Sequence, residues 1–170
     1  MIRILVVDDH PSVRAALEIS LNLEPDMKVI ATAADGPTAL RLAHERRPDV
    51  LVLDLCMPGM SGVEVIRLLP DVLPEIRIVA FTGDDEEREA ALASGAFCVV
   101  VKDAPLDDLL RAIRFASHAA PLSVKGRPAP SGEARERRLA RMTQRAVRSV
   151  PTPGSSGGLL GRLQARPHSQ

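Results

Sequence analysis

The chain has 170 residues, 45% hydrophobic and only 2% aromatic, and its 22 basic residues balance its 22 acidic ones. This length allows one domain and an appendage, with a core that Val, Leu, Ile and Ala must build. The two cysteines follow no zinc or redox spacing, which favours reduced thiols in a cytoplasmic protein over a disulfide scaffold. No stretch approaches the roughly 18 apolar residues of a membrane span, and the first residues indicate a strand rather than a signal peptide.

The balanced charge conceals a division along the chain. Residues 1–120 hold 12 basic and 20 acidic residues, a net charge of −8, whereas residues 121–170 hold 10 and 2, a net charge of +8. Such an asymmetry is typical of contact with nucleic acid or a membrane surface, or of a basic tail that docks on an acidic domain.

Apolar runs and amphipathic segments alternate up to about residue 120. The runs predict strands at residues 2–7, 28–32, 50–53, 76–81 and 97–101. The segments between and after them predict helices at about residues 12–23, 37–47, 63–69, 85–93 and 105–117. This alternation predicts an α/β domain, (βα)5, over residues 1–120, with a parallel sheet covered by helices on both faces.

Residues 121–170 differ in character. Their Arg, Pro and Gly content predicts a mostly disordered tail, although a thin apolar stripe beside several arginines allows one short helix over residues 133–149. We favour a solvated tail over contact with nucleic acid or membrane, and over docking on the acidic domain. No aromatic residues interleave the arginines, so base stacking is not indicated.

Reactive side chains follow four of the predicted strands. Asp8 and Asp9 follow the first strand, Asp54 the third, Thr82 the fourth and Lys102 the fifth. Each is ordinary alone at a strand end, but the five together are not. Because ligands of open parallel sheets bind beyond the carboxyl ends of the strands, we expect these side chains in one crevice. Clustered carboxylates repel one another, and a hard cation such as Mg²⁺ relieves that repulsion and leaves one carboxylate as a candidate nucleophile for a phosphoryl group.

These motifs resemble the receiver domain of two-component response regulators. The resemblance covers residues 1 to about 120. It rests on Val6-Val7-Asp8-Asp9-His10, on residues 53–62, on Phe81-Thr82-Gly83 and on Val101-Lys102-Asp103-Ala104. The run Asp-Asp-His-Pro at residues 8–11, with Val13-Arg14 and Lys102-Asp103-Ala104, is most similar to the LuxR/NarL-type subfamily, which ends in a helix-turn-helix.

The resemblance implies a flavodoxin-like doubly wound sheet of strand order 2-1-3-4-5. It implies that Asp54 accepts a phosphoryl group from a sensor histidine kinase, and that Thr82 and Lys102 bind that group. Mg²⁺ is then held by Asp8, Asp9, Asp54 and the backbone carbonyl of Cys56. A downstream target or a second copy of the chain is expected on one of two faces. One face combines the helix at 85–93, the strand at 97–101 and the helix at 105–117; the other combines the helices at 12–23 and 105–117.

The chain departs from the family pattern in two places. Val99 stands three residues before Lys102, where the family has a Tyr or Phe that swings inward as the Thr moves toward the phosphoryl group. Residues 121–170 lack the apolar spacing of a helix-turn-helix, so we expect no such module there.

The leading hypothesis is a phosphorylation-dependent switch in signal transduction, not a metabolic enzyme. One alternative is a DNA-binding transcriptional regulator of the LuxR/NarL type with a truncated or degraded output domain. Another is a pseudo-receiver that binds partners without phosphorylation. A haloacid-dehalogenase-like phosphohydrolase is disfavoured because that family needs Asp-x-Asp after the first strand, where this chain has Asp8-Asp9-His10. We expect ordinary loop roles for His10 and for the Cys56 side chain.

Overall fold

The computed structural model describes residues 1–83 and 86–119, together with residues 133, 137, 140 and 141. Strands and helices alternate strictly over residues 2–118, as the apolar runs predict. In chain order they are β1 Ile2–Val7, α1 Pro11–Leu23, β2 Met27–Ala33, α2 Gly36–Arg46, β3 Val50–Leu53, α3 Gly62–Val72, β4 Arg77–Thr82, α4 Glu86–Ser94, β5 Cys98–Val101 and α5 Leu106–His118.

The five strands form one parallel sheet of order β2-β1-β3-β4-β5. This order and the flavodoxin-like α/β architecture confirm the predicted fold. The central strand β3 is apolar and buried along its whole length, as expected for a parallel strand covered on both faces.

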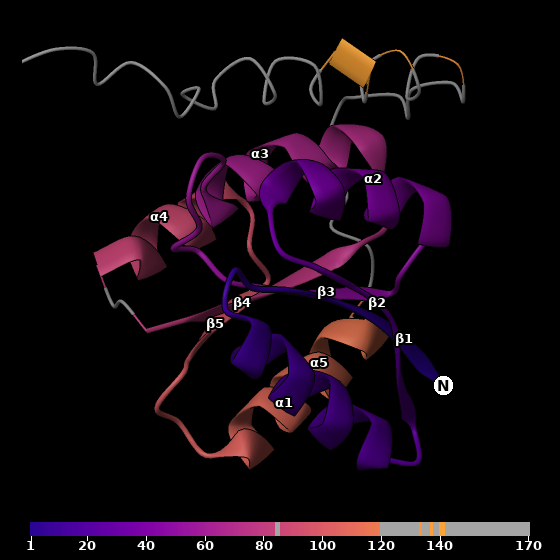
Figure 1. Ribbon diagram of the computed structural model, residues 1–170, viewed down its shortest axis with the longest axis vertical. Coiled ribbons are helices and arrows are strands. Elements are labelled where there is room, and N and C mark those ends of the chain that lie inside the picture. The colour runs from indigo at the N-terminus through magenta and orange to yellow at the C-terminus, as the bar shows by residue number, and fades with distance from the viewer. Residues whose placement is uncertain (84–85, 120–132, 134–136, 138–139, 142–170) are drawn as a thin grey trace, which may run out of the picture.

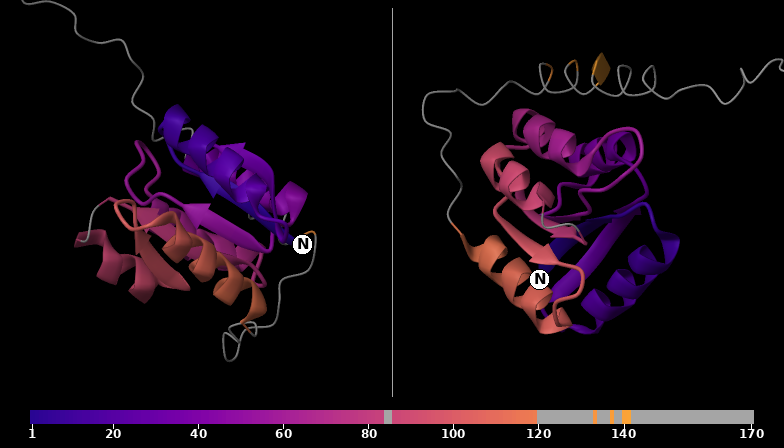
Figure 2. Two further views of the ribbon diagram at one scale, coloured as in Figure 1. Left: turned by 90° about the horizontal axis from the view of Figure 1, so that it is seen from below. Right: turned by 90° about the vertical axis from the view of Figure 1, so that its left-hand side faces the viewer.

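Helices cover both faces of the sheet (Figure 1). α2, α3 and α4 lie on one face, and α1 and α5 lie on the other, as the two further views agree (Figure 2). Successive strand residues point to opposite faces, so each strand feeds two separate apolar clusters. In β3, Leu51 and Leu53 join the cluster under α2, α3 and α4, whereas Val50 and Val52 join the cluster under α1 and α5.

Two differences from the predicted element boundaries have a physical reason. α3 continues to Val72, beyond its predicted end at Leu69, although Pro70 lies inside it. Pro70 is in the last turn, where its missing N–H removes a single helix bond, and the Leu73 N–H still closes the helix on the Leu69 carbonyl at 2.8 Å. Thr82 is the last residue of β4 rather than the first residue after it, so pairing with β5 fixes its backbone.

The predicted tail over 121–170 lies outside the described residues, apart from four that are helical and exposed: Glu133, Arg137, Ala140 and Arg141. The boundary at residue 120 therefore stays a prediction. Within the described part of the chain, no helix is long and apolar enough to cross a membrane.

Candidate functional site

Four strands deliver the predicted site residues to one edge of the sheet. Asp8 follows β1, Asp54 follows β3, Thr82 ends β4 and Lys102 follows β5. Backbone hydrogen bonds continue the sheet through these positions. The Asp54 N–H donates to the Val7 carbonyl at 2.8 Å, and the Lys102 N–H donates to the Thr82 carbonyl at 2.8 Å. The side chains therefore start from rigid backbone, which is what a precise polar site requires.

Lys102 joins two buried carboxylates. Its Nζ lies 2.7 Å from Asp54 Oδ2, in a hydrogen bond, and 2.8 Å from Asp8 Oδ2, in an ion pair whose atoms are not aligned as a hydrogen bond. Asp8 and Asp54 are almost fully buried, whereas the lysine side chain keeps 22% of its surface exposed. Burial disfavours the charged amine, but the hydrogen bond to Asp54 and the close negative charges of Asp54 and Asp8 outweigh it and raise the pKa of Lys102 above its ordinary value.

The loop after β1 holds the remaining acidic group. The His10 N–H donates to Asp8 Oδ1 at 2.8 Å, and His10 Nδ1 lies 2.7 Å from Asp9 Oδ1. Arg14 Nη1 donates to the Asp8 carbonyl at 2.6 Å and to the Asp9 carbonyl at 3.0 Å. Arg14, which the sequence reading did not single out for the site, thus fixes the backbone of the acidic pair from the first turn of α1. An arginine near the start of an amphipathic helix is usually a surface residue, so the sequence does not indicate its bonds to the Asp8 and Asp9 carbonyls.

A tight loop between β3 and α3 forms the opposite wall. The Cys56 N–H donates to Asp54 Oδ1 at 3.2 Å, and Gly59 has a positive φ of 82°, which favours glycine. At Gly62 a β-carbon would lie 2.3 Å from the Asp54 carbonyl oxygen and 2.6 Å from Leu55 Cα, so only glycine fits there. Ser61 and Glu64 then cap α3 reciprocally, which fixes where the loop ends.

Thr82 and Val99 occupy different parts of this edge. The Thr82 side chain is fully buried, and its Oγ1 lies 4.0 Å from Cys56 Sγ, so the end of β4 contacts the loop that follows Asp54. Val99 is half-buried and packs on the apolar cluster under α2, α3 and α4. Its small side chain fills that position without the ring that the resemblance leads one to expect.

The donor set fits a divalent cation with oxygen ligands. Ligand atoms of Asp8, Asp9, His10 and Asp54 all lie within 4.8 Å of one another. Asp8 Oδ2 and Asp9 Oδ1 are buried oxygens with ion-pair contacts but no aligned hydrogen bond among the described residues: Asp8 Oδ2 lies 2.8 Å from Lys102 Nζ, and Asp9 Oδ1 lies 2.7 Å from His10 Nδ1. Buried anionic oxygens of this kind are stabilised by a bound cation.

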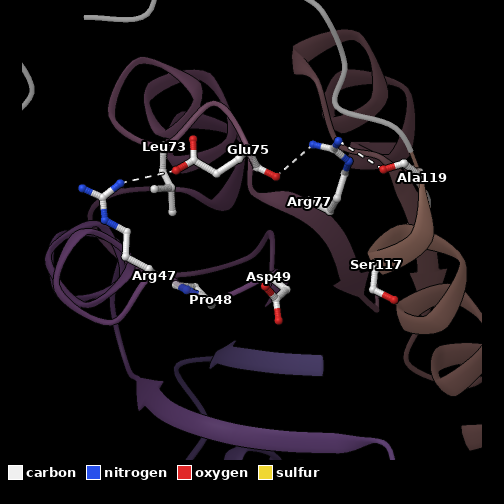
Figure 3. A pocket seen from close by; sticks show the side chains of 8 residues that line it. All are labelled: Arg47, Pro48, Asp49, Leu73, Glu75, Arg77, Ser117 and Ala119. Atoms are coloured by element: carbon white, nitrogen blue, oxygen red, sulfur yellow. Dashed lines mark hydrogen bonds and ion pairs between the residues drawn. The ribbon is translucent and has the colours of Figure 1, made fainter. Parts of the chain in front are cut away.

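The amino end of the sheet holds a separate cavity of about 450 Å³ (Figure 3). Its lining includes Arg47, Asp49, Glu75 and Ser117 and the buried Arg77, and none of the predicted site residues. Figure 3 shows the Arg77 guanidinium between the Glu75 backbone and the end of α5.

The Arg77 guanidinium is held by backbone carbonyls. Nη1 donates to the carbonyls of Glu75 at 3.1 Å and Ile76 at 3.3 Å, and Nη2 donates to the Ala119 carbonyl at 3.4 Å. Its Nε makes no hydrogen bond with the described residues. These bonds tie the start of β4 to the end of α5, which is a structural role.

Comparisons with known proteins cover the same part of the chain. Residues 4–114 match the family model described as "Response regulator receiver domain". The transcriptional regulatory protein LiaR of Bacillus subtilis is 37% identical over 123 residues, which cover 71% of this chain and 58% of LiaR. The oxygen regulatory protein NreC of Staphylococcus aureus (strain JH9) is 42% identical over 115 residues, 66% of this chain and 53% of NreC. The chain thus spans little more than half the length of these relatives.

Solved structures agree with this assignment. A two-component response regulator of the LuxR family from Aurantimonas sp. SI85-9A1 is 32% identical, with a TM-score of 0.66, and the match covers 84% of this chain and 97% of that one. The receiver domain of CheB from Thermotoga maritima is 31% identical, with a TM-score of 0.65 over 71% of this chain and 99% of that one. The family model covers well over half of the chain, which therefore belongs to the response regulator receiver family, a family of signalling domains rather than of enzymes.

Proposed function

We propose that this receiver takes a phosphoryl group on Asp54 from the phosphohistidine of a sensor histidine kinase and thereby switches its contacts with partners. The observation that carries the proposal is the position of the Lys102 ammonium, within 2.8 Å of carboxylate oxygens of both Asp8 and Asp54. A cation placed against a buried carboxylate at a strand end is suited to binding the oxygens of a phosphoryl group formed on that carboxylate.

The transfer is a substitution at phosphorus. An oxygen of Asp54 forms the new P–O bond, the P–N bond to the donor imidazole breaks, and the imidazole leaves with the electron pair and takes up a proton. Lys102 moves its ammonium from the free carboxylate to a phosphoryl oxygen, and the Thr82 hydroxyl donates to another. The Cys56 N–H, 3.2 Å from Asp54 Oδ1, holds the nucleophile in place.

We assign the metal site to Asp8, Asp9 and Asp54 with the backbone carbonyl of Cys56, and Mg²⁺ to that site. When bound there, Mg²⁺ would neutralise charge on the phosphoryl oxygens. The fit rests on the buried oxygens of Asp8 and Asp9 and on the three carboxylates of Asp8, Asp9 and Asp54, whose oxygens lie within 4.8 Å of one another.

The partners follow from the family and the fold. We propose that the chain acts in the cytoplasm, with a sensor histidine kinase as the donor, and with either a downstream protein or a second copy of the chain as the receiver of the signal. The surface involved is the α4–β5–α5 face or the α1–α5 face. Val99 lacks a ring to move between buried and exposed positions, so we propose that the signal reaches the α4–β5–α5 face through Thr82 and the backbone of β5, which Lys102 extends.

Intact mass spectrometry tests the phospho-acceptor. The full chain is incubated with Mg²⁺ and acetyl phosphate beside a receiver known to be labelled under the same conditions. We expect the mass of one added phosphoryl group on the unmutated chain and on Asp103→Ala, whose exposed carboxylate follows Lys102, but none on Asp54→Ala. An unmutated chain that gains no mass, while the control receiver does, contradicts the proposal and favours the pseudo-receiver.

A second proposal concerns the output. LiaR is named a transcriptional regulatory protein, and this chain covers only part of it. We propose that the signal controls transcription, as in a LuxR/NarL-type regulator. Fluorescence anisotropy of labelled duplex DNA, titrated with the full chain at several salt concentrations, tests whether this chain itself binds DNA. Binding whose affinity falls steeply with salt supports direct DNA contact by this chain, and no binding at low salt contradicts direct contact.

A further inference from the structure

The helix α1 begins without the local features that stabilise the starts of α2, α3, α4 and α5. N-cap side chains bond helical amides in α2, through Asp35, and in α3, through Ser61, while α4 and α5 carry acidic residues in their first turns. α1 has no acidic residue in its first turn, its N-cap residue His10 makes no side-chain capping bond, and Arg14 places a positive charge in that turn. Because the macrodipole disfavours a cation at a helix N-terminus, Arg14 is locally unfavourable, and such departures from local rules are expected at functional sites.

The backbone of the acidic pair compensates Arg14 for this unfavourable position. Its Nη1 donates to the carbonyl oxygen of Asp8 at 2.6 Å and to that of Asp9 at 3.0 Å. Arg14 is half-buried, and hydrogen bonds from a charged donor are roughly twice as strong as bonds between neutral groups. The two carbonyls belong to the peptide units on either side of Asp9. A single nitrogen that bonds both therefore limits the φ and ψ angles of Asp9, and with them the direction in which its side chain leaves the backbone.

The two carboxylates of this pair differ in how their side chains are held. Asp8 is almost fully buried, and its two oxygens contact the His10 N–H at 2.8 Å and Lys102 Nζ at 2.8 Å. The Asp9 side chain is 25% exposed and lies 2.7 Å from Nδ1 of the His10 imidazole, which is itself 65% exposed. A contact with so exposed a partner holds a carboxylate only weakly, because water competes for both groups. The placement of the Asp9 carboxylate therefore depends mainly on its backbone, which Arg14 holds.

We propose that Arg14 is a positioning residue for phosphoryl transfer, which acts by holding the Asp9 carboxylate in place at the site. The inference rests on the proposed function and deepens it. A carboxylate that is already placed in the free protein does not have to be ordered when its ligand binds, so binding is stronger. Arg14 should therefore act on the Mg²⁺ affinity of the site, through Asp9, rather than on the attack by Asp54.

Two measurements on the full chain test this role. Calorimetric titration with Mg²⁺ gives the affinity in the absence of a phosphodonor, and intact mass spectrometry gives the rate of phosphorylation by acetyl phosphate at saturating Mg²⁺. Both compare the unmutated chain with Arg14→Gln and with the matched control Arg114→Gln. Arg114 bonds Glu24 at 2.6 Å and Asp26 at 2.8 Å beside the opposite end of α1, so its loss loosens α1 without touching the acidic pair. We expect Arg14→Gln to weaken Mg²⁺ binding by about tenfold or more and to change the rate at saturating Mg²⁺ by less than about threefold, whereas Arg114→Gln keeps the affinity within about twofold.

The outcomes separate this inference from the proposed function. Unchanged Mg²⁺ affinity in Arg14→Gln, or an equal loss in Arg114→Gln, overturns the positioning role and leaves Asp54 as the phospho-acceptor. If circular dichroism shows that Arg14→Gln does not fold, Arg14→Lys takes its place, because it keeps the charge but lacks the planar fork of donors. We then expect Mg²⁺ binding to weaken by about threefold, and an unchanged affinity overturns the role. An unmutated chain that binds no Mg²⁺ and gains no phosphoryl group overturns both proposals.

Discussion

The two ends of the sheet both bury charge, but they compensate it differently. At the carboxyl end, the Lys102 ammonium contacts Asp8 and Asp54, and Asp9 adds a third carboxylate to the cluster. At the amino end, the guanidinium of Arg77 is surrounded by the carbonyls of Glu75, Ile76 and Ala119.

This difference teaches how a functional site differs from a structural one. Backbone carbonyls come with the fold, and a guanidinium that bonds them ties elements together. An excess of carboxylates destabilises the fold unless a further cation binds, so its presence points to a ligand. The imbalance, rather than the burial, marks the carboxyl end as the site.

Gly62→Ala should have the largest effect, because the new β-carbon would lie 2.3 Å from the Asp54 carbonyl oxygen. We expect the free energy of unfolding to fall by about 3 kcal/mol, measured by urea denaturation. Gly83→Ala is the matched control, since nothing lies within 4 Å of its β-carbon. A change of less than about 0.5 kcal/mol is expected for that control. Equal stability of the two variants would contradict the close approach of α3 to the Asp54 loop.

Arg77→Ala tests the amino end. We expect a loss of about 2 kcal/mol in the free energy of unfolding, because the bonded carbonyls of Glu75, Ile76 and Ala119 lose their donor. Phosphorylation of the folded variant by acetyl phosphate should be unchanged. If Arg77→Ala kept full stability but lost phosphorylation, the division of roles between the two ends would be wrong.

Asp9→Asn should raise the free energy of unfolding, whereas the two substitutions above lower it. Removing one carboxylate from the cluster relieves repulsion while both Lys102 contacts remain, so the free energy of unfolding should rise by about 1 kcal/mol in the absence of metal. Saturating Mg²⁺ should stabilise the unmutated chain more than this variant, because binding to the folded state adds to stability. Asp49→Asn, at the amino end, removes a carboxylate that accepts the Arg3 N–H and should not stabilise. A stabilised Asp49→Asn would show that the gain is a general charge effect.

The smallest predicted effect is a difference in the rates at which the two cysteines are modified. Cys56 is exposed at the carboxyl end, whereas Cys98 in β5 is half-buried, and that burial raises the pKa of its thiol. A raised pKa leaves less thiolate at about pH 8, so a thiol reagent should modify Cys56 about tenfold faster than Cys98, as followed by peptide mass spectrometry. Faster modification of Cys98 would contradict the described packing of β5.

Much of the fold could be predicted because its signals are local. Four-residue apolar runs such as Val50–Leu53 are typical of buried parallel strands. Their alternation with amphipathic segments then predicts a parallel sheet with helices on both faces. Boundaries were less predictable. Pro70 predicts a helix end on local grounds, but the packing of α3 retains it inside the last turn.

The site was predictable in its members but not in its contacts. The rule that strand ends meet at one edge places Asp8, Asp54 and Lys102 together. That rule says nothing of side chains from the flanking loops. The Arg14 bonds to the acidic loop and the orientation of His10 depend on how α1 leaves the sheet. The hydrogen bond from Arg77 to the Ala119 carbonyl depends on where α5 ends, and no sequence pattern within β4 indicates that position.

The most direct test of the central claim is to locate the phosphoryl group. After reaction with acetyl phosphate and Mg²⁺, borohydride reduces an acyl phosphate on aspartate to the alcohol, which converts that residue to homoserine. Peptide mass spectrometry then identifies the position. We predict homoserine at residue 54 alone, and none when Mg²⁺ is withheld by a chelator. Homoserine at residue 8 or 9, or none anywhere while a control receiver is converted, would contradict the account.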